Sequence, residues 1–297
     1  QSHRWTDSTR GVTKSLSSNN TNAEATEATG LTAFSSDGFT LGGAGGYNGN
    51  ARTYAGWQWK ANGGTTASNT DGSITSTVQA NTTAGFSIVT YTGNGSSGAT
   101  IGHGLGAVPS MFIIKRRSGT EDWVVYHHKN TSAPETDHLL LNTTDATSDS
   151  DTRFNDTAPT SSLITMGNNA VINASGSTYV GYCFAEKQGY SKFGSYTGNG
   201  NADGTFIYTG FKPAWVMTKE TGATGAWYMH DTKRDPSNGA THQLIANTNE
   251  VEYDTGSDVN IDILSNGFKQ RYAGGSQNGN GDTHIYMAFA ESPFVSS

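Results

Sequence analysis

Cysteine is almost missing from this chain, since Cys183 is the only one among 297 residues. A single cysteine excludes disulfides within the chain and metal sites built from several thiolates. Charged residues are also scarce, at 14%. No apolar run approaches the roughly 18 residues that a membrane-spanning helix needs. We therefore expect neither a disulfide scaffold nor membrane insertion.

Basic residues are too few and too scattered for nucleic-acid binding, which needs a face rich in Lys and Arg. The net charge is −7, and the densest basic run is only Lys115–Arg117. The sequence shows no charged-then-apolar signal peptide. Because it opens on Gln1 rather than Met, we expect an upstream part to have been removed or to lie outside this sequence.

The residues that are abundant favour a folded β protein. Gly occurs 38 times, and Tyr, Phe and Trp together make up 10% of the chain. Aromatic side chains supply the large buried surfaces that disordered chains lack. The composition is unlike that of helical enzymes or coiled coils, which use more Ala, Glu, Lys and Leu.

The chain repeats itself. "YTGNG" stands at Tyr91–Gly95 and again at Tyr196–Gly200, and Phe-Ala-Glu ends at Glu186 and again at Glu291, in both cases 105 residues apart. Such a fixed step is the signature of tandem structural repeats. It predicts two copies of one module, at residues 86–189 and 190–297.

A third, partial copy precedes them. "SDGFTLGGAGGYNGNARTY" (Ser36–Tyr54) resembles "SNGFKQRYAGGSQNGNGDTH" (Ser265–His284) with one insertion. Residues 1–61 are therefore predicted to be the C-terminal half of a repeat. Residues 62–85 are rich in Gly, Ser and Thr, as is typical of a linker or surface excursion.

Alternating side chains indicate strands. Val180, Tyr182 and Phe184 alternate with their neighbours, and residues 285–289 and 55–59 follow the same pattern. A period of two is the strand signal, and the Asn-Gly and Asp-Gly pairs suit tight turns. We predict an all-β fold of tandem β-sandwich or jelly-roll-like modules with essentially no helix.

No constellation of catalytic residues stands out. Glu186 and Glu291 are the most regular carboxylates, but each occurs once per repeat at a strand end, whereas glycoside hydrolysis needs two facing carboxylates. A pairing role at the strand end is favoured for both. No G-x-S-x-G nucleophile elbow occurs, and "GHGLGAVP" (Gly102–Pro109) is not followed by a helix pattern that would let it cradle phosphate. We expect no enzyme activity and no catalytic residue.

Metal and cofactor sites are also not expected. His127 and His128 are adjacent, so on a strand they point to opposite faces and cannot easily share one metal. "DVNID" places Asp258, Asn260 and Asp262 at alternate positions that calcium accepts, but it lacks the Gly and distal Glu of a calcium loop. The sequons at Asn81 and Asn142 are expected by chance in such a chain.

The remaining candidates point to packing and to loops. Trp57 and Trp59 could stack on sugars, but they align with Tyr182 and Phe184 and with Met287 and Phe289, which favours core packing. Cys183 aligns with Gln58 and Ala288 and is predicted to be a thiol without a catalytic role. A ligand, unidentified here, would be bound in loops that differ between repeats, at Thr131–Asp137 or Arg234–His242.

The motifs resemble a known group of proteins. "ANTTAGFSIVTYTGNG", "IGHGLGAVPSMFIIK" and "YMAFAESPF" are similar to repeats in tail and tail-fibre-like virion proteins of bacteriophages that infect marine bacteria. The resemblance implies a structural component of an extracellular particle, assembled in the host cytoplasm. It carries no catalytic residue.

Three functions remain open. The first is a tail-fibre or appendage component that contributes to host attachment, bound to other virion proteins and contacting a host-surface glycan or protein. The second is a purely architectural decoration or filament subunit without a ligand. The third is a polysaccharide depolymerase, which the missing carboxylate pair disfavours.

The partial repeat predicts assembly. Residues 1–61 carry closing strands, including "TYAGWQW", but lack the opening strands of a repeat. A β module without these strands exposes sheet edges and an apolar face. We expect it to be completed by upstream residues or by a neighbouring subunit, and we favour a homo-oligomer, such as a trimer.

Overall fold

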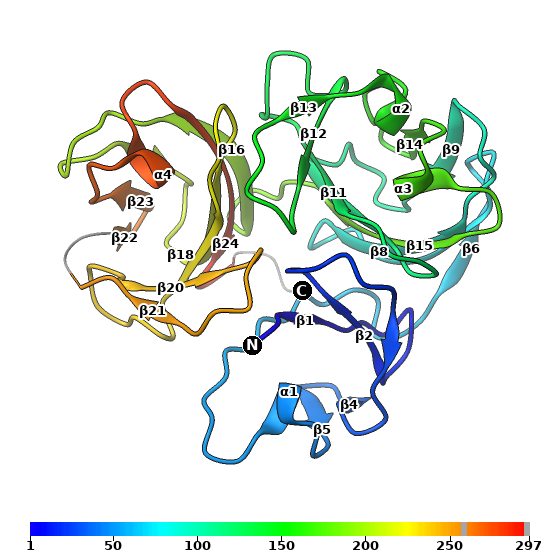
Figure 1. Ribbon diagram of the computed structural model, residues 1–297, viewed down its shortest axis with the longest axis horizontal. Helices are drawn as coiled ribbons and strands as arrows, with labels where there is room; N and C mark the ends of the chain where they lie inside the picture. The colour runs from blue at the N-terminus through cyan, green and yellow to red at the C-terminus, as the bar shows by residue number, and fades with distance from the viewer. Residues whose placement is uncertain (257–259, 294–297) are drawn as a thin grey trace.

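The computed structural model describes residues 1–256 and 260–293 and shows three lobes around a common centre (Figure 1). We call them the half-unit (residues 1–61), the first unit (62–189) and the second unit (190–293). The fold of the described residues is all-β, as predicted, and their helices are short, with four residues each.

The half-unit contains β1 (Arg4–Trp5), β2 (Lys14–Ser17), β3 (Ala25–Thr26), β4 (Leu31–Phe34), β5 (Phe39–Leu41) and α1 (Gly45–Asn48). The first unit contains β6 (Ala67–Asn69), β7 (Ser76–Asn81), β8 (Phe86–Thr92), β9 (Ala99–Gly102), β10 (Met111–Arg116), β11 (Trp123–His127), β12 (Asp137–Leu140), β13 (Ser148–Asp149), α2 (Asp151–Phe154), β14 (Leu163–Met166), α3 (Ala170–Asn173) and β15 (Thr178–Phe184). The second unit contains β16 (Ser191–Thr197), β17 (Phe206–Tyr208), β18 (Pro213–Glu220), β19 (Trp227–Asp231), β20 (His242–Ile245), β21 (Tyr253–Asp254), β22 (Ile261–Leu264), β23 (Gly267–Gln270), α4 (Gly275–Asn278) and β24 (Thr283–Ala290).

The two complete units have the same strand order. The main antiparallel sheet of the first unit contains the order β8-β15-β10-β11-β12-β13, and that of the second unit is β16-β24-β18-β19-β20-β21. A small sheet packs against each, β9–β14 in the first unit and β17–β23–β22 in the second. This shared strand order is what the 105-residue step predicts for two copies of one module.

Two expectations about strands are wrong. The linker predicted at residues 62–85 contains β6 and β7, which extend the main sheet beside β8, with Val78 paired to Val89 and buried. The segment is rich in Ser and Thr, so the few apolar side chains that enter the core gave no clear strand pattern in the sequence. "TYAGWQW" (Thr53–Trp59) forms no strand, because both strands that would flank it are missing from the half-unit.

The "YTGNG" motif joins the first strand of the repeat, β8 or β16, to the short helix before its last strand, α3 or α4. The Tyr91 hydroxyl donates to the Ile172 carbonyl at 2.7 Å, and the Tyr196 hydroxyl donates to the Gln277 carbonyl at 2.7 Å. A Cβ atom added at Gly93 would lie 2.5 Å from the Ala174 carbonyl oxygen, so only glycine allows this approach. The motif recurs because it docks a strand onto a helix.

Replacing Tyr91 with Phe should lower the free energy of unfolding by about 1 kcal/mol, since the buried Ile172 carbonyl loses its donor. Urea unfolding followed by circular dichroism measures the change. Tyr208→Phe is the control, because Tyr208 is 63% exposed, and it should have no effect. Equal effects of the two substitutions would contradict this role for the hydroxyl.

The three lobes share one apolar core at their centre. Trp59, Phe184 and Phe289 come from equivalent positions of the three lobes, and their ring centroids lie 5.4–6.4 Å apart. The core-packing interpretation of Trp57 and Trp59 is confirmed, as both pack against this core. Separate apolar clusters fill the two complete units between their main and small sheets.

Contacts to backbone carbonyls bridge all three junctions, and two of them join equivalent residues. The Glu121 N–H donates to the Thr21 carbonyl at 2.9 Å, and the Gly225 N–H donates to the Thr144 carbonyl at 2.9 Å. The Gln1 amino group binds the Asn249 carbonyl at the third junction. The three lobes therefore form a closed ring with an approximate threefold repeat. Among the described residues, no helix has the length and apolar character to span a membrane.

Candidate functional site

The two strand-end carboxylates lie in ion pairs. Glu186 lies 2.7 Å from Lys192 Nζ and also accepts from the Phe193 N–H. Glu291 lies 2.8 Å from Lys212 Nζ, and the pKa of Glu291 is lowered by the hydrogen bond from Lys212. Each therefore neutralises a lysine of the second unit, which agrees with the pairing role favoured from the sequence.

The histidine pair joins the first unit to the second. His127 Nε2 lies 3.2 Å from the Tyr286 carbonyl oxygen, and His128 Nε2 lies 3.0 Å from that of Phe193. His127 Nδ1 accepts from the Lys129 N–H, so Nε2 carries the proton of a neutral ring. Burial, followed by the charge of His128, lowers the pKa of His127 to about 3.

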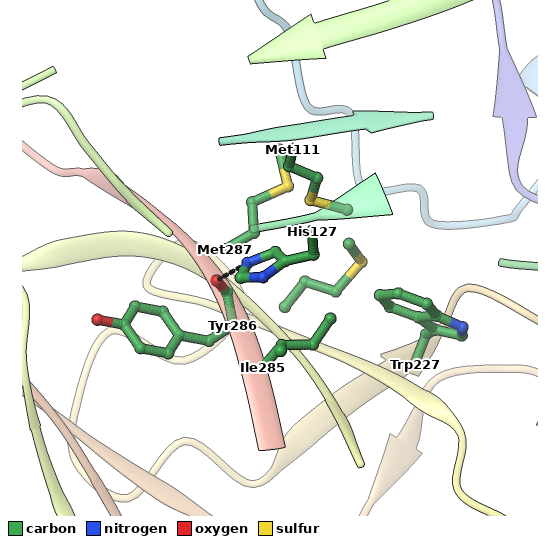
Figure 2. A pocket seen from close by; sticks show the side chains of 7 residues that line it. Met111, His127, Trp227, Ile285, Tyr286 and Met287 are labelled. Atoms are coloured by element: carbon green, nitrogen blue, oxygen red, sulfur yellow. Dashed lines mark hydrogen bonds between the residues drawn. The ribbon is translucent and has the colours of Figure 1, made fainter. Parts of the chain in front are cut away.

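The surroundings of His127 leave no room for a ligand. Figure 2 shows the ring between Met111 of the first unit and Ile285, Tyr286 and Met287 of the second unit. The hollow between these side chains has no space for a water molecule. The pair therefore acts as a contact between units, and in the described part of the chain no three His, Cys, Asp or Glu side chains cluster as metal ligands would.

The "DVNID" candidate is only partly visible. Asp258 lies outside the described residues, so the expectation that this segment binds no metal stays a prediction. Asp262 Oδ2 lies 3.4 Å from Arg271 Nε.

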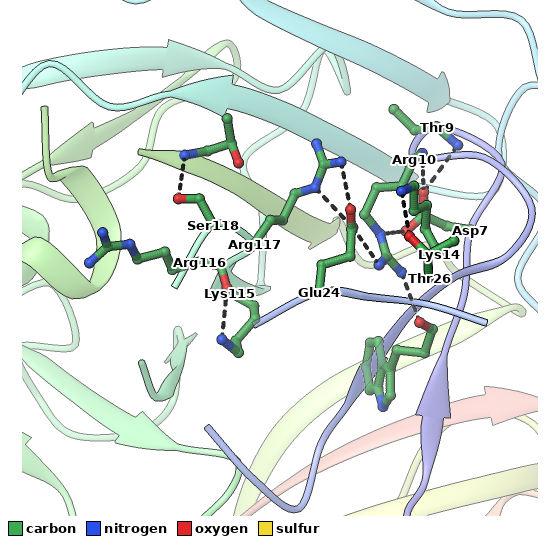
Figure 3. A network of polar contacts seen from close by, with 12 residues as sticks. Asp7, Thr9, Arg10, Lys14, Glu24, Thr26, Lys115, Arg116, Arg117 and Ser118 are labelled. Carbon is green, nitrogen blue, oxygen red and sulfur yellow. Dashed lines mark hydrogen bonds and ion pairs between the residues drawn. The ribbon is translucent and has the colours of Figure 1, made fainter. Parts of the chain in front are cut away.

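A buried ion network, which the sequence reading missed, joins the half-unit to the first unit (Figure 3). Arg10 is fully buried at its side chain and binds Asp7, Glu24 and the Trp5 carbonyl. Glu24 also accepts two hydrogen bonds from Arg117, both at 3.0 Å. Burial alone would raise the pKa of Glu24, but the hydrogen bonds from Arg117 and Arg10 outweigh it and lower the pKa.

The same network recurs in the second unit. Arg234 binds Asp231 at 2.6 Å, Glu252 at 2.9 Å and the Met229 carbonyl at 3.1 Å. The Asp-x-x-Arg spacing at Asp7/Arg10 and Asp231/Arg234 was the signal that could have revealed it.

Each network is closed by a residue of the neighbouring lobe. The Tyr182 hydroxyl donates to Asp7 at 2.8 Å, and Trp57 Nε1 donates to Asp231 at 3.2 Å. Arg234 also lies 5.8 Å from the centre of the Trp57 ring. The ion networks therefore hold the lobes together.

The two loops expected to differ between repeats do differ. In Thr131–Asp137 the Thr131 hydroxyl binds the Asp137 carboxylate. In Arg234–His242 the His242 ring lies 2.6 Å from Asp235, and this hydrogen bond raises the pKa of His242. Both loops carry exposed residues at their tips.

The half-unit also contains a polar hollow of about 190 Å³, lined by Arg4, Ser15 and Ser17 among others. Arg4 lies 2.9 Å from Glu27 and 3.1 Å from the Ser17 hydroxyl, so its charge is already compensated.

Cys183 lies buried in β15, and burial raises its pKa to about 12. Cys183→Ala should leave the fold intact and cost roughly 1 kcal/mol, the loss expected for one buried heavy atom. A thiol reagent should modify the wild-type protein only once denaturant unfolds it. Rapid modification of the folded protein at pH 8 would contradict a buried, structural thiol.

Comparison with known proteins assigns the chain to a family. A family model described as a domain of unknown function (DUF7483) matches residues 1–293. No curated protein and no solved structure matches the chain.

Proposed function

Because the chain belongs to the family described as Domain of unknown function (DUF7483), a description that names no activity, we propose a function from its architecture. The protein is a structural component of a phage virion, in a tail fibre or similar appendage, and it contributes to host attachment through loops on its β units. The resemblance of its repeat motifs to tail-fibre-like proteins supports this role.

The observation that carries the proposal is that several largely buried charged, histidine and tryptophan side chains lie at junctions between lobes. Arg10, His127 and Trp57 bind across junctions between lobes, and Arg234 lies against the Trp57 ring across one of them. A ring whose polar and aromatic groups hold its own units together suits a rigid part of a particle. The loops Thr131–Asp137 and Arg234–His242 remain for contact with a host surface, where many weak contacts on one particle add up.

Electron microscopy of the virus that encodes the protein tests its location. Antibodies against the purified chain, detected with gold particles, should label the tail or its appendages. Labelling of the capsid shell would favour the decoration role instead. If the protein were present in infected host cells but absent from the purified particles, a virion role would be excluded.

A glycan array and a reducing-sugar assay separate attachment from the other functions. We expect weak, multivalent glycan binding that falls when the loop residues 236–239 are replaced by Gly and Ser, and no release of sugar. Sugar release would support the depolymerase. Replacement of 131–133 tests the other loop, and unchanged binding in both variants would place attachment elsewhere.

A further inference from the structure

The half-unit lacks the two strands that flank the closing strand of a complete unit. β15 lies between β8 and β10, and β24 lies between β16 and β18. Residues 53–59 are equivalent to these closing strands, but they form no strand, and all except Trp57 and Trp59 are exposed. Within residues 1–256 and 260–293, no strand pairs with either backbone edge of this segment, so both edges can accept a partner.

Apolar side chains that are buried in the complete units are exposed here. Phe34 and Phe39 face each other across β4 and β5, as Ile263 and Phe268 do across β22 and β23. Phe39 is 37% exposed, whereas Phe268 is 0% exposed. Phe34 is 42% exposed, against 6% for Ile263.

The polar contacts that hold the short helix of a complete unit are also present in the half-unit. The Tyr54 hydroxyl donates to the Gly45 carbonyl at 2.9 Å and accepts from the Gly49 N–H at 2.7 Å. Tyr179 makes the same two contacts with Ala170 and Ala174, at 2.6 and 2.8 Å. α1 is therefore held in the half-unit as α3 is held in the first unit.

The side chain of Asn48 in α1 has no counterpart of one interface contact within the part of the chain that the structure describes. In the complete units, Asn173 and Asn278 accept the N–H of the Asn in "YTGNG", at 3.0 and 3.1 Å, and both are fully buried. The equivalent Asn48 is exposed. The opening strand that would contact Asn48 is therefore the same one that would cover Phe34 and Phe39.

We propose that the half-unit is an acceptor for an opening segment of this same repeat type. The segment supplies one strand that ends in Tyr-Thr-Gly-Asn-Gly and a second strand like β10. Its strands pair with both edges of residues 53–59, its Tyr hydroxyl binds the Tyr47 carbonyl, and its apolar face covers Phe34 and Phe39. The inference does not depend on the virion role.

A second copy of residues 1–297 is not the occupant that the structure favours. Its own opening strands, β8–β10 and β16–β18, are committed to their units and bury residues such as Val89 and Val216. Two half-units lack the same strands, so they cannot complete each other. This argues against the simple homo-oligomer expected from the sequence.

The test adds the missing segment to the whole chain. A further copy of residues 85–121 is fused ahead of Gln1, and amide hydrogen exchange is compared with that of the unfused protein. We expect exchange at residues 53–59 to slow by about tenfold or more, as for amides entering a stable sheet. The thermal midpoint should also rise.

A matched control carries Gly93→Val in the added copy only. In the first unit a Cβ at Gly93 would lie 2.5 Å from a backbone oxygen, so this fusion should not dock and should exchange as fast as the unfused chain. Equal exchange in all three proteins would overturn the proposal. So would an unfused chain that light scattering shows to be a dimer with residues 53–59 already protected.

Discussion

Lowering the pH from 7 to 4 is expected to destabilise the protein strongly and to unfold it near the lower limit. Four of the five buried histidines have a strongly lowered pKa, namely His127, His138, His230 and His284, and burial is the largest cause in each. The pKa is about 3 for His127 and about 4 for each of the other three.

The direction follows from proton binding. In the unfolded chain these rings take up protons below pH 6.5, whereas in the folded protein they stay neutral until about pH 4 or 3. The unfolded state therefore binds more protons between these values, and stability falls as the pH falls through that window. For each ring, the free energy of unfolding falls by on the order of 2–3 kcal/mol across this window. The four losses together approach the whole free energy of unfolding of a typical domain.

Circular dichroism across this pH range measures the effect, and the repeat offers a matched variant. His284 stacks on Tyr196, and the equivalent pair in the first unit is Tyr179 on Tyr91. His284→Tyr should therefore move the acid midpoint to lower pH. His242→Gln, at a partly exposed ring, should not. If the acid midpoint were unchanged in His284→Tyr but shifted when carboxylates were replaced, the histidines would not be the origin of the acid unfolding.

Replacing Arg10 with Met should lower the free energy of unfolding by about 3–5 kcal/mol, the cost of breaking a buried ion pair from one side. The largely buried carboxylates of Asp7 and Glu24 would lose the positive charge beside them, and the Tyr182 hydroxyl and the Trp5 carbonyl would each lose a partner. Urea unfolding followed by tryptophan fluorescence reports on this junction, because Trp5 lies 5.3 Å from Trp123 between ring centroids.

Arg116 provides the control. Its ion pair with Glu121 is 3.2 Å long, and both side chains are about a quarter exposed, so Arg116→Met should cost less than about 1 kcal/mol. Arg10→Lys should give an intermediate loss, since an ammonium cannot replace the planar fork of the guanidinium. If Arg10→Met were as mild as Arg116→Met, the network would not hold the junction.

The sequence by itself determined the repeat and the fold class. The period-two alternation at Val180–Phe184 and the "YTGNG" and "FAE" landmarks predicted the strands, their equivalence and the half-unit. These features are local or are copied at a fixed step, so they can be recognised in the linear chain. The same alignment placed Trp57 and Trp59 in the core.

Only the tertiary structure decided how the lobes meet. Arg10 and Tyr182 are 172 residues apart, as are many partners across the ring, and no periodicity in the sequence encodes such a pair. The strand pattern at Thr53–Trp59 was misleading for the same reason. A strand exists through hydrogen bonds to its neighbours. Where both neighbours are missing, an ideal alternation leaves an extended segment without a sheet.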